Sequence, residues 1–148
     1  MNKRINILET EPEALKAMYG LAGYVAKTGL THIHQELIKI RASQINNCAY
    51  CLDMHTADAL KYGETQQRLF VLSAWRETDF FTEEEQVILS MTEEITLISK
   101  SGLTEETYQK ALQLFDENYI AQIIMAIVTI NAWNRIGVSS LLKVAERK

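Results

Sequence analysis

Apolar residues recur with the period of an α-helix along most of this chain. From about residue 11 to Gly29, and again from Thr31 to Ile45, they stand three or four positions apart, so each segment presents one apolar face. Asn46-Asn47 predicts a turn into a third helix that ends at Gly63. The pattern predicts an all-α fold in which the second and third helices form a hairpin.

The second half of the chain carries further helix start and stop signals. Four more helices are predicted: about residues 66–73, from the capping box of Thr82 and Glu85 to Gly102, from the cap Thr104 onward, and about residues 119–146. The expected fold therefore has about six to seven helices. Because no repeat or linker separates them, we predict a single domain over residues 1–148.

Composition supports helices and excludes two classes of function. The 148 residues are 47% hydrophobic and include one proline and six glycines, which favours helix over sheet. A net charge of −4 without a basic stripe argues against nucleic-acid binding. The longest apolar run, Ile123 to Ile130, is shorter than the roughly 20 residues of a spanning helix, so we expect no membrane partner. With no secretion signal at the N-terminus, we expect a cytoplasmic protein.

The two cysteines are the candidate chemistry of this chain. They stand in Cys48-Ala49-Tyr50-Cys51, at the expected start of the third helix, and His55 follows four residues later. On a helix these three side chains fall within about 60° of one another, so two sulfurs and an imidazole share one stripe. In a reducing cytoplasm such a pair is typical of catalytic, redox-sensing or metal-binding sites.

Peroxide reduction by a protein requires a reactive thiolate and a second thiol, and the stripe of Cys48, Cys51 and His55 can provide both. A helix N-terminus near Cys48, an imidazole one turn from Cys51 and a second thiol all favour a reactive thiolate. The thiolate attacks the O–O bond and becomes a sulfenic acid, which the neighbouring thiol converts to a disulfide. The spacing therefore favours a thiol-dependent peroxidase.

Glu36 joins the candidate site by a geometric argument. In an antiparallel hairpin, Glu36 lies about 16 Å before the turn and His55 about 13 Å after it, whereas Cys51 lies only about 7 Å after it. Glu36 should therefore reach His55 before a sulfur, which suggests a proton relay from Glu36 through His55 to Cys51. Because Glu36 falls at the edge of an apolar face, we expect burial to raise its pKa, so that it acts as a base.

These residues resemble a known family. The pattern Glu36-x11-Cys48-x2-Cys51-x3-His55 is similar to the alkylhydroperoxidase D-like (AhpD-like) branch of the carboxymuconolactone decarboxylase family. The resemblance extends to three further segments: Ser73-Ala74-Trp75-Arg76, Thr82-Glu83-Glu84-Glu85 and Ile130-Asn131-Ala132-Trp133-Asn134-Arg135.

The resemblance implies roles as well as a fold. It implies small all-helical subunits in obligate oligomers, Cys51 as the thiol that attacks peroxide, Cys48 as the thiol that resolves it, and Glu36 and His55 as the relay. The best-known hydroperoxidase of this branch carries a histidine where this chain has Tyr50. The family's decarboxylases lack the cysteine pair, which makes decarboxylation the weaker expectation here.

A non-enzymatic thiol module is the alternative. Cys48, Cys51 and His55 could bind zinc with His32 or His34 as the fourth ligand, or the pair could sense redox state. We favour the peroxidase, which takes electrons from a dithiol donor and needs no tightly bound cofactor and no metal. We expect a homo-oligomer: a dimer, trimer or hexamer.

Overall fold

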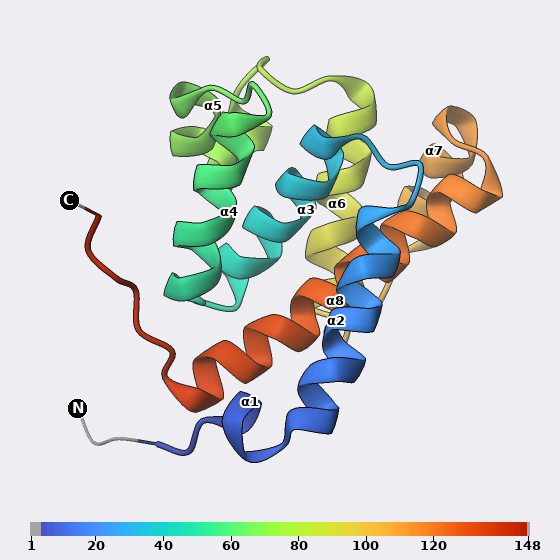
Figure 1. Cartoon of the computed structure of the whole chain (residues 1–148). Helices are drawn as coiled ribbons and strands as arrows, with labels where there is room; N and C mark the ends of the chain where they lie inside the picture. Colours follow the sequence, from blue (N-terminus) through green and yellow to red (C-terminus); the bar gives the residue numbers. More distant parts are fainter. Residues whose placement is uncertain (1–3, 148) are drawn as a thin grey trace.

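The computed structural model describes residues 4–147, and this part of the chain is helical (Figure 1). Its elements, in chain order, are α1 (Ile7–Thr10), α2 (Pro12–Ala26), α3 (His32–Ile45), α4 (Ala49–Lys61), α5 (Gln66–Val71), the 3-10 helix η1 (Leu72–Glu77), α6 (Glu83–Thr96), α7 (Glu105–Leu114) and α8 (Glu117–Ser140). No strand occurs within these residues, so the prediction of an all-α fold is confirmed.

The helices begin where the sequence places capping side chains. Thr82 accepts a hydrogen bond from the backbone N–H of Glu85, whose carboxylate accepts one from the N–H of Thr82, and this completes the predicted capping box. Thr104 caps α7 with its hydroxyl oxygen, which accepts a hydrogen bond from the backbone N–H of Thr107. The α3–α4 turn passes through Asn47 at a positive φ of 54°, a conformation that asparagine tolerates well.

Helix α3 lies at the centre of the molecule, between α4 and α6 and against α8 (Figure 1). Ile38 and Ala42 pack into an apolar cluster with α2, α6, α7 and α8. Leu37 and Ile40 pack into a second cluster with α4, η1 and α6. Because α3 is buried on two sides, its predicted site residue, Glu36, is held rigidly in the core.

A buried polar layer ties the α3–α4 turn to α8. Asn46 donates hydrogen bonds to the side-chain oxygens of Asn131 and Asn134, each at 3.0 Å. Asn134 is fully buried and donates to the hydroxyl of Ser43 at 2.9 Å. These bonds fix the start of α4, and with it the cysteine pair, against the last helix.

Two helix ends and two short helices differ from the sequence predictions. Helix α6 ends at Thr96 rather than Gly102, and α8 ends at Ser140 because Leu141 adopts a left-handed conformation with φ of 51°. Helix α1 and the 3-10 helix η1 are additional to the seven predicted segments. Short helices of this kind depend on tertiary packing, which local patterns do not encode.

Among residues 4–147, no helix is both long and apolar enough to cross a membrane.

Candidate redox-active site

Cys48 and Cys51 form a disulfide at the start of α4. Cys48 is the N-cap of this helix and has an extended backbone, so it lies outside the helix rather than on the predicted continuous stripe. Its Sγ turns back over the first turn and accepts a hydrogen bond from the backbone N–H of Cys51 at 3.4 Å. Both cysteines are buried, and the prediction that the CxxC motif opens a helix of a hairpin is confirmed.

Glu36 of α3 and His55 of α4 meet across the hairpin. The Oε2 of Glu36 lies 3.1 Å from the Nδ1 of His55, and both side chains are buried. The predicted contact is therefore present. It follows from the short turn and the fixed rise of the two helices, which bring the two positions level.

The charge state of Glu36 differs from the prediction. Burial acts to raise its pKa, but the hydrogen bond from His55 and the charge and hydrogen bond of Lys39 outweigh burial, so the pKa lies below the ordinary value of 4.5. Lys39 donates to the Oε1 of Glu36 at 2.8 Å. The expectation of a raised pKa is wrong, because two donors satisfy the carboxylate within the core.

An ionised Glu36 determines the tautomer of His55. A carboxylate can only accept hydrogen bonds, so the Nδ1 of His55 carries the hydrogen that Glu36 accepts. In the neutral ring the Nε2 is then left as the acceptor. Glu36 thus orients the imidazole and leaves its second nitrogen available as a hydrogen-bond acceptor.

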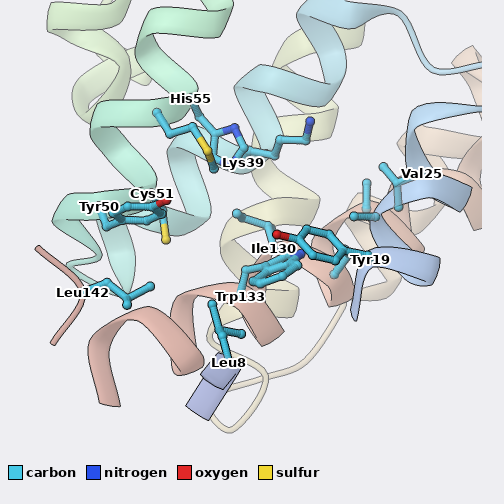
Figure 2. Close-up of a pocket in the computed structure, with 14 residues that line it drawn as sticks. Leu8, Tyr19, Val25, Lys39, Tyr50, Cys51, His55, Ile130, Trp133 and Leu142 are labelled. Carbon is cyan, nitrogen blue, oxygen red and sulfur yellow. The ribbon is translucent and has the colours of Figure 1, made fainter. Parts of the chain in front are cut away.

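A cavity of about 260 Å³ lies against Cys51 and His55 (Figure 2). We call it the Cys51 cavity; Cys48 is absent from its lining. The residues that line it are Leu8, Tyr19, Ala22, Val25, Lys39, Tyr50, Cys51, Met54, His55, Ala126, Thr129, Ile130, Trp133 and Leu142. They come from α1, α2, α3, α4, α8 and the segment after α8, and most are apolar.

Sequence reasoning missed several contributors to this site. Lys39 lies one turn from Glu36 on α3 and lines the cavity, a role that no local pattern in the sequence indicates. Trp133 packs against the core cluster and also lines the cavity, together with Tyr19, whose ring centroid lies 5.8 Å from that of Trp133. These residues are far apart in sequence, so only the packing of α2 and α8 brings them to Cys51.

Gly137 of α8 packs directly on the disulfide. A Cβ atom at this position would lie 3.1 Å from the Sγ of Cys48 and 3.7 Å from the Sγ of Cys51. The only signal in the sequence is a glycine inside a helix, where it is unfavourable by about 1 kcal/mol relative to alanine. The close approach of α8 to the sulfurs is a physical reason for that glycine.

The zinc alternative finds no ligand set in the described part of the chain. Within residues 4–147, no group of three or more His, Cys, Asp or Glu side chains is placed to hold a metal ion. His32 stacks on Tyr62 at the surface. His34 is buried, and its Nδ1 lies 2.7 Å from the hydroxyl of Tyr119.

Comparison with known proteins identifies the family. The model of the carboxymuconolactone decarboxylase family matches residues 12–94, more than half of the chain, and this region includes Glu36, both cysteines and His55. The chain belongs to this family. Its place in the AhpD-like branch is supported by the similar structures, as follows.

Two similar proteins cover nearly the whole chain. The uncharacterized protein YdfG of Bacillus subtilis is 41% identical over 139 residues, which is 94% of this chain and 95% of YdfG. The structure of a protein of unknown function from Agrobacterium tumefaciens, described as a candidate antioxidant defence protein AhpD, is 36% identical with a TM-score of 0.95; the match covers 99% of this chain and 100% of that one.

The same fold also occurs with another named activity. The debrominase Bmp8 has a TM-score of 0.82 and 17% identity, over 93% of this chain and 74% of its own. At this identity the likeness concerns the fold alone. The activity must therefore be argued from the residues of the site.

Proposed function

We propose that this protein is a thiol-dependent peroxidase that reduces organic hydroperoxides with Cys51 and Cys48. The observation that carries the proposal is a bonded cysteine pair beside an imidazole whose tautomer is held by a buried, ionised carboxylate. This is the set of groups that a peroxidatic thiol requires: a proton acceptor, an oriented partner and a resolving thiol.

In the proposed reaction, the Nε2 of His55 takes the proton of the Cys51 thiol. The thiolate attacks the distal oxygen of the hydroperoxide, the O–O bond breaks, and Cys51 becomes a sulfenic acid while an alkoxide leaves and is protonated to the alcohol by His55. The Cys48 thiol then attacks the sulfenic sulfur, which releases water and forms the disulfide. Each turnover reduces one hydroperoxide and oxidises two thiols.

The assignment of the two roles rests on access. Cys51 and His55 line the same cavity, one helical turn apart on α4, whereas Cys48 does not line it (Figure 2). A peroxide in this cavity reaches Cys51 first. The largely apolar lining, with Trp133 and Ile130 opposite the sulfur, favours an apolar organic hydroperoxide over hydrogen peroxide.

The electron donor and the assembly belong to the same proposal. A dithiol is the donor that regenerates a vicinal cysteine pair without leaving a stable mixed disulfide. We also propose that the protein is a homo-oligomer. Large apolar side chains such as Phe70, Ile98 and Tyr19 are exposed on this chain, and a subunit interface would cover such side chains. Light scattering at micromolar protein measures the assembly directly.

The test is a single turnover followed by trapping. Reduced protein receives one equivalent of cumene hydroperoxide, and free thiols and cumyl alcohol are counted. We expect loss of both thiols and one alcohol per chain, and in Cys48→Ser we expect a sulfenic-acid reagent to label Cys51. Label on Cys48 in the Cys51→Ser variant, with none on Cys51, would reverse the roles. If the wild-type thiols are unchanged, the peroxidase proposal is wrong and the non-enzymatic thiol module is the better interpretation.

A matched pair of variants tests the carboxylate. Glu36→Gln should slow oxidation of Cys51 by about a hundredfold, because the amide no longer holds the imidazole in the tautomer that accepts a proton. Glu106→Gln is the control, since Glu106 is exposed on α7 and its pKa is lowered only by its pairing with Lys110 on the same helix. Equal oxidation rates for the two variants would remove Glu36 from the mechanism.

A further inference from the structure

A second cavity lies against the other cysteine of the same disulfide. This cavity of about 670 Å³, the Cys48 cavity, is lined by Cys48 and Gly137 and by the segment that follows α8, and Cys51 is absent from its lining. Tyr50 and Leu142 line both cavities and therefore lie between them; Figure 2 shows both residues near Cys51. The two cysteines of one disulfide therefore lie against two different spaces.

We infer that the two half-reactions use these two spaces: the hydroperoxide enters the Cys51 cavity, and the thiol that reduces the disulfide enters the Cys48 cavity and attacks Cys48. This inference rests on the proposed peroxidase function. It assigns an entrance to the electron donor and makes Cys48 the sulfur on which the donor is held.

Thiol–disulfide exchange fits this direction of attack. A donor thiolate in the Cys48 cavity forms a bond to the Sγ of Cys48, the Cys48–Cys51 bond breaks, and Cys51 leaves as a thiolate that faces its own cavity beside His55. The second thiol of the donor then attacks the donor sulfur of the mixed disulfide, and Cys48 leaves as a thiolate. Two electrons pass from the dithiol to the protein, and the donor becomes a disulfide.

The second step leaves Cys48 in a favourable place for a thiolate. Cys48 is the N-cap of α4, where the backbone N–H of Cys51 already donates to its Sγ. A negative sulfur at this position faces the positive end of the helix dipole. Both leaving sulfurs are therefore supported, each by a group on its own side of the pair.

Apolar and basic side chains complete the lining of the Cys48 cavity. Val138, Leu141 and Val144 add apolar surface. Arg4 and Lys143 also line this cavity, so the lining suits a small dithiol that is partly apolar and carries no positive charge.

The two half-reactions can be measured separately on a matched pair of variants. Val138 lines only the Cys48 cavity and Met54 lines the Cys51 cavity, and both side chains are 41% exposed, so tryptophan can be placed at either without filling the core. We expect Val138→Trp to slow reduction of the oxidised protein by dithiothreitol about tenfold while peroxide oxidation stays within about twofold. Met54→Trp should show the reverse. Slowing of both half-reactions by either variant would mean that one space serves both.

A trapping experiment needs no variant. Oxidised wild-type protein is mixed with excess 2-mercaptoethanol and quenched with N-ethylmaleimide. The peptide that contains both cysteines is then fragmented in a mass spectrometer, and cleavage between Cys48 and Cys51 shows which label each cysteine carries. We expect the mixed disulfide on Cys48 and the maleimide on Cys51; the opposite distribution overturns the inference. No peroxide is used, so a protein inert toward peroxide can still label at Cys48, and the failure of the proposed function stays distinguishable from the failure of this inference.

Discussion

A methyl group added at Gly137 should press on the disulfide. The Cβ of Gly137→Ala would lie 3.1 Å from the Sγ of Cys48, closer than the roughly 3.5 to 4.0 Å at which non-bonded atoms attract best. The Asn134 and Asn131 hydrogen bonds to Asn46 hold α8 against the start of α4, so the helix cannot easily move away. The variant therefore overpacks a rigid contact.

The expected magnitude is the difference between two effects. Alanine gains about 1 kcal/mol over glycine in a helix interior, and an overpacked core loses about 1 to 3 kcal/mol. Gly137→Ala should therefore lower the free energy of unfolding by about 0 to 2 kcal/mol. Gly23→Ala in α2 is the control, because its Cβ would meet nothing within 4 Å, and it should raise stability by up to about 1 kcal/mol.

Urea unfolding of the oxidised proteins, followed by circular dichroism at one protein concentration, measures both variants. The contact itself is tested by adding Gly137→Ala to Cys48→Ala, which removes the crowded sulfur and the disulfide together. On that background Gly137→Ala should stabilise as Gly23→Ala does, giving a coupling energy of about 1 to 3 kcal/mol. If Gly137→Ala already stabilises the wild type, α8 does not press on the sulfurs and the reasoning is refuted.

Two other predictions concern the supporting fold. Burial, which outweighs an opposing pull from Glu84 and Glu85, lowers the pKa of His34 from 6.5, so the unfolded chain binds this proton first and wild-type stability should fall as the pH drops below 6.5. In urea titrations, His34→Gln should flatten this dependence and the surface variant His32→Gln should keep it; identical profiles would contradict the prediction. Thr82→Ala should cost about 1 kcal/mol by removing the cap of α6, whereas Thr82→Ser keeps the hydroxyl and should unfold at the wild-type urea midpoint.

Helix caps and turns could be predicted from the sequence because the interactions that form them join residues only a few positions apart. The caps at Thr82 and Thr104 depend on side chains that bond their own backbone, and the turn depends on Asn47, a residue type that tolerates a positive φ. The contact between Glu36 and His55 could also be predicted, because a short turn and a fixed helical rise determine which residues of the two helices lie level in a hairpin. Sequence alone thus determined the helices of the first half and the core of the candidate site.

Only the tertiary structure decided the environment of that core. The pKa of Glu36 is lowered rather than raised because Lys39 and His55 both bond the carboxylate within the packed hairpin. The two cavities exist because α8, with Gly137, returns from far along the chain to lie against Cys48 and Cys51. Such long-range packing leaves no periodic trace in the sequence, because it depends on how whole helices fill the core rather than on any local pattern.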